Sequence, residues 1–195
     1  MPMTAPIILT LLRIALIPVL VLFFYVPFAW SNIAAVAVFV SAALTDWLDG
    51  YIARRTGQLT RFGAFLDPVA DKLMVATALV LLVQQKPTVP FTLAAAIIIG
   101  REIAISALRE WMAELGEKGR VTVSAFGKIK TIFQMVAIAL LLYRDDIGVL
   151  PIALIGEVLL YLAAGLTLWS MWVYLHSAWP IMAAPPGSDE EESGG

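Results

Sequence analysis

Six long apolar segments constrain the fold of this chain more than any other feature. A helix that spans a bilayer needs about 20 apolar residues. The segments cover residues 6–29, 33–54, 65–84, 88–114, 121–143 and 148–176. They are too long and continuous for barrel strands, and backbone groups in lipid must hydrogen-bond within the protein. The sequence therefore predicts an all-α integral membrane protein, a bundle of six transmembrane helices.

The composition supports one membrane domain with a polar tail. Of the 195 residues, 61% are hydrophobic and 14% are charged. We expect a membrane domain over residues 1–180 and a disordered acidic tail over 181–195. The first segment has no cleavage-site pattern, so we interpret it as a retained helix. The chain has no cysteine, which excludes disulfides and thiolate metal sites.

Lysine and arginine are distributed unequally between the two sides of the predicted bundle. One side holds only Lys86 and Arg144. The other side holds the remaining eleven: Arg13, Arg54, Arg55, Arg61, Lys72, Arg101, Arg109, Lys118, Arg120, Lys128 and Lys130. Because cytoplasmic loops carry the excess of positive charge, this side is predicted to be cytoplasmic, together with both termini.

Two stripes of aspartates mark the cytoplasmic ends of the second and third predicted helices. The helical spacing i, i+3, i+4, i+7 places one set on a single face: Asp46, Asp49, Gly50 and Ala53. The spacing i, i+4, i+8 does the same for Gly63, Asp67 and Asp71. A short basic turn, Arg54 to Arg61, would join the helices, and Pro68 predicts that the second helix begins near Gly63 to Asp67 or kinks there. Antiparallel packing would bring the two stripes together.

Four converging carboxylates need a counter-charge. Two unit charges about 4–5 Å apart repel by roughly 3–4 kcal/mol at an effective dielectric near 20. The only histidine is the distant His176, and oxygen ligands of this kind suit Mg²⁺ or Mn²⁺, with room for two ions. Two-metal sites typically serve phosphoryl-type displacement. The alternatives are a structural acid–base network and a cation pathway or proton relay.

The full pattern resembles the motif of the CDP-alcohol phosphotransferase family. Every fixed position is present in Asp46-x-x-Asp49-Gly50-x-x-Ala53-Arg54 and in Gly63-x-x-x-Asp67-x-x-x-Asp71. The segment from Arg101 to Gly116 is similar to bacterial family members whose acceptor is glycerol 3-phosphate. The resemblance implies a six-helix bundle, usually a homodimer, with a polar cavity open to the cytoplasm and sideways to lipid. It also implies location in the bacterial inner membrane.

The resemblance also implies residue roles and a reaction. Asp46, Asp49 and Asp67 would be metal ligands, and Asp71 would be both a metal ligand and the general base. The residues lining the nucleotide diphosphate would be Gly50, Ala53, Arg54 and Gly63. The phosphatidyl group of CDP-diacylglycerol would pass to the 1-hydroxyl of glycerol 3-phosphate by direct displacement, releasing CMP. Cardiolipin-forming or phosphatidylinositol-phosphate-forming members, and a cation or proton transporter, are the alternatives.

An acceptor that carries a phosphate needs cations in the cavity. The candidate acceptor-binding residues are Thr10, Arg13, Arg101, Arg109 and Lys128, with Lys128 the first choice for the acceptor phosphate. For Arg101 the alternative is a local pair with Glu102 or another carboxylate. Lys130 is interpreted as a lipid-headgroup contact. Thr4 stands where relatives commonly have asparagine, Glu157 has no assigned role, and Arg144 to Asp146 is interpreted as a solvated turn.

Overall fold

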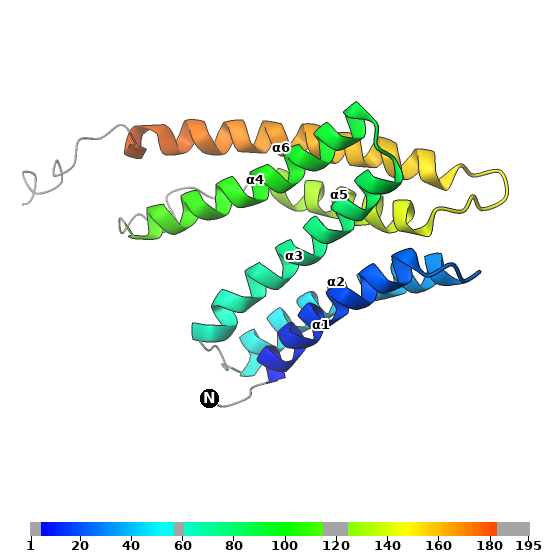
Figure 1. Cartoon of the computed structure of the whole chain (residues 1–195). Coiled ribbons are helices and arrows are strands. Elements are labelled where there is room, and N and C mark those ends of the chain that lie inside the picture. Colours follow the sequence, from blue (N-terminus) through cyan, green and yellow to red (C-terminus); the bar gives the residue numbers. More distant parts are fainter. Residues whose placement is uncertain (1–4, 57–60, 115–124, 183–195) are drawn as a thin grey trace, which may run out of the picture.

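The chain folds into six α-helices, and each helix runs in the direction opposite to the one before it (Figure 1). The structure is a computed structural model that describes residues 5–56, 61–114 and 125–182. The helices are α1 (Ala5–Tyr25), α2 (Ser31–Thr56), α3 (Arg61–Gln85), α4 (Val89–Glu114), α5 (Ala125–Tyr143) and α6 (Ile152–Met182). The described residues contain no strand, only an isolated bridge between Ile147 and Leu150. The predicted all-α class is confirmed.

The connections between helices define two ends of the bundle. The connections α1–α2, α3–α4 and α5–α6 lie together on the right of Figure 1, and we call this the turn end. The N-terminus and the ends of α2 and α4 lie at the opposite end, which we call the motif end because the aspartate stripes are there. This arrangement follows from antiparallel neighbours joined by short turns.

Three of the six helices are long and apolar enough to cross a membrane. They are the segments Ile7–Tyr25, Val89–Met112 and Ile152–His176. Within the described residues, α2 and α5 carry shorter apolar stretches, Ser31–Asp46 and Lys130–Tyr143. The charged residues near the motif end shorten the apolar part of these helices. The protein is therefore a membrane protein, and the number of its helices that cross the bilayer stays a prediction.

Two details of the aspartate segment differ from the sequence expectation. α2 continues to Thr56, so Arg54 belongs to a helix and not to the basic turn. α3 begins at Arg61, two residues before Gly63, and Pro68 lies inside it. Proline removes one backbone hydrogen bond from a helix interior. Helices of membrane proteins tolerate this loss because neighbouring groups satisfy the freed carbonyl.

Small side chains let the helices approach closely at the centre of the bundle. The buried core includes alanines from several helices, among them Ala42, Ala78, Ala95, Ala137 and Ala164. Small residues favour close packing of helices in membranes, where the hydrophobic effect between helices is weak. The most extensive contacts join α5 to α6 and α1 to α2. The core therefore holds the six helices in one bundle and fixes the directions of the polar residues at its ends.

Gly156 lies at a close approach of α6 to α5. A Cβ atom placed on Gly156 would lie 2.9 Å from Cγ of Leu141 and 3.2 Å from the carbonyl oxygen of Ala137. A Cβ atom on Gly165, on the same helix, would meet nothing within 4 Å among the described residues. The two glycines therefore differ in packing and not in secondary structure.

We expect Gly156→Val to destabilise the protein and Gly165→Val to leave its stability almost unchanged. Overpacking a close contact costs about 1–3 kcal/mol, whereas the propensity change is the same at both positions. The measurement is the thermal midpoint of unfolding of the two variants in the same detergent. Equal midpoints would show that the α5–α6 contact is not as close as described.

Candidate functional site

The first helix supplies one partner to each aspartate stripe, an ion pair to one and a hydrogen bond to the other. The Nη1 atom of Arg13 lies 2.8 Å from Oδ1 of Asp46. The hydroxyl of Thr10 donates a hydrogen bond to Oδ1 of Asp67. Thr10 and Arg13 are one helical turn apart, so they share a face of α1, and both are buried. The two aspartates therefore converge from α2 and α3 onto the same face of α1.

The Arg13–Asp46 pair joins a buried cation to a partly open carboxylate. The Arg13 side chain is 1% exposed and the Asp46 side chain is 46% exposed. A buried guanidinium needs a negative partner, because an isolated charge in a medium of low dielectric is strongly disfavoured. The exposed part of the Asp46 carboxylate remains accessible from the motif end. Asp46 can therefore pair with Arg13 and still contact a ligand.

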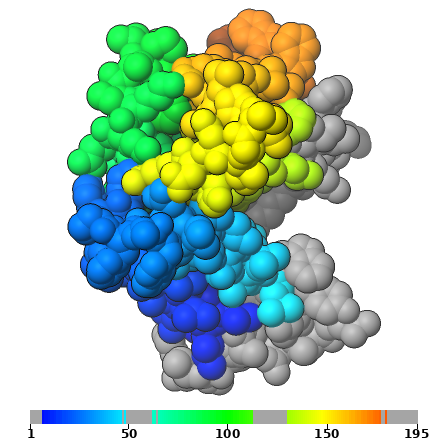
Figure 2. Space-filling view, turned by 90° about the vertical axis from the view of Figure 1, so that its right-hand side faces the viewer, coloured from blue at the N-terminus to red at the C-terminus, as the bar shows by residue number. Residues whose placement is uncertain are grey.

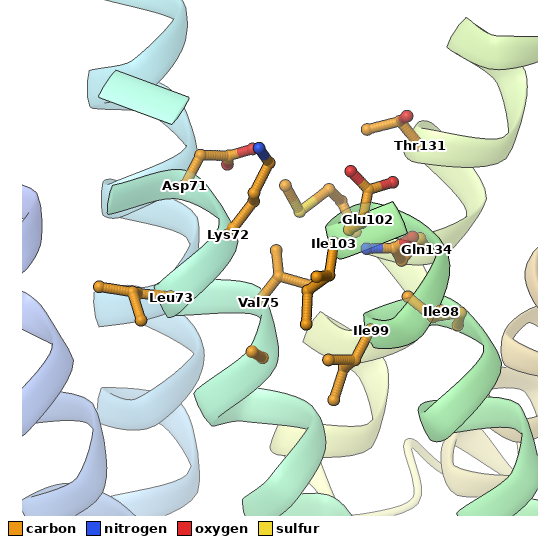
Figure 3. Close-up of a pocket in the computed structure, with 12 residues that line it drawn as sticks. Asp71, Lys72, Leu73, Val75, Ile98, Ile99, Glu102, Ile103, Thr131 and Gln134 are labelled. Carbon is orange, nitrogen blue, oxygen red and sulfur yellow. The ribbon is translucent and has the colours of Figure 1, made fainter. Parts of the chain in front are cut away.

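Asp71 lies between this cluster and a larger cavity. It lines a small void together with Arg13, and it also lines a cavity of about 220 Å³ between α3, α4 and α5. In Figure 3, Asp71 and Lys72 stand on one wall, and Glu102, Thr131 and Gln134 stand on the opposite wall. Asp71, one of the three motif aspartates whose side chains the structure describes, thus lines a cavity.

The cavity has a polar part and an apolar part. Most of its apolar wall is formed by residues of α3 and α4, among them Leu73, Val75, Ile98, Ile99 and Ile103 (Figure 3). Leu73 and Ile103 are largely exposed on the outside of the bundle. A cavity with carboxylates beside aliphatic side chains suits a ligand that has a polar head and an apolar tail.

Glu102 is the centre of a second polar cluster on the other side of the cavity. Its Oε1 atom accepts hydrogen bonds from Nη1 of Arg101 at 2.9 Å and from Nζ of Lys130 at 3.2 Å. The Nη2 atom of Arg101 lies 3.4 Å from Oγ of Ser170 on α6. One carboxylate therefore binds cations from its own helix and from α5.

Two sequence interpretations change with this cluster. Lys130 is 3% exposed and ion-paired, so its assignment to lipid headgroups is wrong: its ammonium points into the bundle towards Glu102. For Arg101, the structure shows the alternative, a pair with Glu102. The sequence did indicate that Glu102 has a partner in the bundle, because it is an acid inside an apolar segment. The partner on α5 could not be identified because it lies on a different helix.

The other predicted site residues fall into two groups. The guanidinium carbon of Arg109 lies 5.9 Å from the centre of the Tyr174 ring, so Arg109 contacts α6, and Gly63 is buried near the start of α3. For the remaining predicted site residues, the structure describes the position in a helix but not the side chain. These residues are Asp49, Gly50, Ala53, Arg54 and Lys128. Most of the predicted tail, residues 183–195, lies outside the described residues, as does Thr4.

The carboxylates fit a hard divalent cation in their chemistry. Asp46, Asp67 and Asp71 provide only oxygen donors, which suit Mg²⁺ or Mn²⁺ better than zinc or copper. Among the side chains that the structure describes, no three acids or histidines are close enough together to hold a metal ion. Asp49, the fourth motif carboxylate, is not among them. The described aspartates alone therefore form an incomplete ligand set.

Comparison with known proteins decides the family. Residues 3–169 match the family model of CDP-alcohol phosphatidyltransferases. The chain belongs to this family. Members of the family generally use divalent metal ions, in agreement with the carboxylate chemistry of the site. The resemblance inferred from the aspartate motif is confirmed.

Three relatives are similar over nearly their whole length, and each is named CDP-diacylglycerol–glycerol-3-phosphate 3-phosphatidyltransferase. The protein of Yersinia pestis (strain Pestoides F) is 53% identical over 95% of this chain and 100% of the relative. The protein of Pseudomonas fluorescens is 56% identical over 91% of both chains. The protein of Shigella flexneri serotype 5b (strain 8401) is 55% identical over 91% of this chain and 96% of the relative.

We expect Glu102→Gln to lower the stability of the protein by about 1–3 kcal/mol, because buried cations would lose their negative partner. Glu110→Gln removes the same charge from an exposed position of α4 and is the matched control. The measurement is the thermal midpoint of each variant in detergent. A loss of stability that is equal in both variants would contradict a central role for Glu102.

Proposed function

We propose that this membrane protein transfers the phosphatidyl group of CDP-diacylglycerol to the 1-hydroxyl of sn-glycerol 3-phosphate. The products are phosphatidylglycerophosphate and CMP. The observation that carries this proposal is the identity of 53–56% to relatives named for this activity, over at least nine tenths of the chain. The convergence of Thr10, Arg13, Asp46 and Asp67 supports it, since these contacts order the carboxylates of the family motif.

The proposed reaction is a direct displacement at the lipid-side phosphorus. Asp71 accepts the proton of the acceptor hydroxyl, the hydroxyl oxygen forms a bond to phosphorus, and the bond from phosphorus to the CMP oxygen breaks. The position of Asp71 on the cavity wall supports this role, because a general base must reach the proton that it removes. The chemistry needs no covalent enzyme intermediate, since attacking and leaving oxygens exchange on one phosphorus atom.

The carboxylates Asp46, Asp49, Asp67 and Asp71 are the proposed ligands of two Mg²⁺ or Mn²⁺ ions. Such ions, when bound, neutralise the charge of a diphosphate. Gly50, Ala53, Arg54 and Gly63 are the proposed residues along the nucleotide diphosphate. Arg13 is proposed to position one of these metal ligands, because it pairs with Asp46 from the buried side.

The proposed acceptor site is formed by cations at the motif end: Arg101, Arg109 and Lys128, with Thr10 and Arg13 on the opposite side. The contact of Arg101 with Glu102 supports a positioning role, since it orients the guanidinium beside the cavity. Glu102 also contacts Lys130, so the acceptor side of the cavity carries several cations around one carboxylate.

The proposed setting is the bacterial inner membrane, with several membrane passes and both termini in the cytoplasm. The alternation of helix direction supports this, because it brings Ala5 of α1 and the end of α6 to the same side as the aspartates (Figure 1). A homodimer is proposed as the assembly, on the resemblance to the family alone.

Asp71→Asn should reduce CMP release by about 10²–10⁴-fold, the usual contribution of a general base. The assay follows CMP from CDP-diacylglycerol with Mg²⁺ and one acceptor at a time: glycerol 3-phosphate, inositol phosphate, serine or phosphatidylglycerol. We expect release with glycerol 3-phosphate only, and loss of release in chelator. Asp145→Asn, at the turn end, is the matched control and should retain activity.

The outcomes of this assay separate the candidate functions. Release with phosphatidylglycerol or inositol phosphate instead would assign the protein to another acceptor class of the same family. Full activity of Asp71→Asn would refute the proposed base and leave the family assignment intact. No release with any acceptor from folded protein would favour the transporter alternative.

Lys128→Gln should raise the KM for glycerol 3-phosphate, because one charge-assisted hydrogen bond to a phosphate contributes about 1.5–3 kcal/mol, which is roughly tenfold or more. The KM for CDP-diacylglycerol should change little and serves as the internal control. Steady-state kinetics with each substrate varied in turn provide the measurement. An equal change in both KM values would place Lys128 outside the acceptor site.

A further inference from the structure

Two cations meet at the turn end of the bundle, at the opposite end from the motif aspartates. Lys86 follows α3, Arg144 follows α5, and both line one cavity of about 190 Å³. Of the 13 lysines and arginines in the chain, these are the two that the sequence places on this side. They are distant in the sequence, so the folded bundle brings them together.

Arg144 has an unusual backbone and a partly unsatisfied side chain. Its φ angle is +66°, in the left-handed region that residues other than glycine rarely adopt. The guanidinium carbon lies 4.1 Å from the centre of the Phe24 ring, and Nε is buried without a hydrogen-bond partner among the described residues. Burial lowers the pKa of Arg144 from its usual range, and the carboxylate of Asp145 opposes this shift. The charge of Arg144 would therefore be stabilised by a further anion.

Lys86 is held in place by a carboxylate of α6. Its Nζ atom donates to Oε2 of Glu157, and the other carboxylate oxygen, Oε1, accepts a hydrogen bond of 2.7 Å from the hydroxyl of Tyr161. The Lys86 side chain is 48% exposed and that of Glu157 is 14% exposed. An ammonium group has three donors, and the contact with Glu157 uses one of them. The ammonium is thus positioned and can bind a second acceptor.

The rest of the cavity wall is mainly apolar. It consists of Leu82, Phe91, Leu141 and Ala153, with Gln85 as a further polar residue. Figure 2 looks onto this end, where the three connections between helices meet. The cavity therefore combines two cations with aliphatic and aromatic side chains at the rim of the bundle. A purely polar anion would use only the charged part of this wall.

We propose that the cavity between Lys86 and Arg144 binds the phosphate group of a phospholipid at the face of the membrane opposite the motif aspartates. Arg144 Nε and the free donors of Lys86 would bond to phosphate oxygens, as charge-assisted hydrogen bonds. The apolar wall would contact the beginning of the acyl chains. The chemistry recognised is a phosphate oxyanion, whose source is a lipid headgroup or free phosphate. This site is separate from the proposed transferase site.

The test is isothermal titration calorimetry of full-length protein in a neutral detergent. The probes are dihexanoyl phosphatidylglycerol, inorganic phosphate and dihexanoyl glycerol, which lacks the phosphate. The variants are Lys86→Gln and Arg144→Gln. Each should weaken binding of the phospholipid by about tenfold, because one charge-assisted hydrogen bond is lost. Lys118→Gln, which removes a cation from the connection between α4 and α5, and Asp71→Asn should bind this probe as the wild type does.

The outcomes decide both the site and the source of the phosphate. Variant-sensitive binding of the phospholipid alone supports a headgroup site, and variant-sensitive binding of inorganic phosphate as well supports recognition of the oxyanion by itself. Wild-type affinity in both variants, or equal binding of dihexanoyl glycerol, overturns the proposal. If Arg144→Gln does not fold, Lys86→Gln decides, since its side chain is half exposed.

Discussion

The contact of Arg13 with Asp46 is the interaction on which the proposed site most depends. A fully buried guanidinium in an apolar bundle requires a negative partner, and the partner is a motif carboxylate. Thr10 adds a contact to Asp67 from the same face of α1. These bonds fix α1 against both α2 and α3. Removing the cation would therefore disturb the helix packing and the carboxylate geometry together.

The same requirement for pairing recurs in the second half of the chain. Glu102 forms ion pairs with Arg101 and Lys130 near the cavity, and Glu157 forms an ion pair with Lys86 near the turn end. Each of these carboxylates thus pairs with a cation of its own helix, of a neighbouring helix or of the turn after α3. Hydrogen bonds of this kind add specificity where helices otherwise pack through alanine and leucine. They determine which faces of α3, α4, α5 and α6 meet.

The sequence was sufficient to predict the helices and the family, because both depend on local patterns. Apolar runs located all six helices, and fixed spacing identified the motif from Asp46 to Asp71. Pairing between helices was not predictable in the same way. Lys130 was misassigned, Glu157 had no assigned role, and the packing of Arg144 on Phe24 was not predicted within a turn whose Asp145 and Asp146 are exposed. Each of these contacts joins residues distant in sequence, which periodicity within one helix cannot reveal.

The unequal packing of the helices has a consequence for motion. α1 packs on α2 and α3, and α6 packs on α4 and α5, whereas α3 and α4 contact each other sparsely. Regions with few packed contacts open at the lowest free energy. The cavity that contains Asp71 lies along this sparse seam. Its walls are therefore joined by few direct contacts between α3 and α4, and they can separate at a lower free-energy cost than the closely packed α5 and α6.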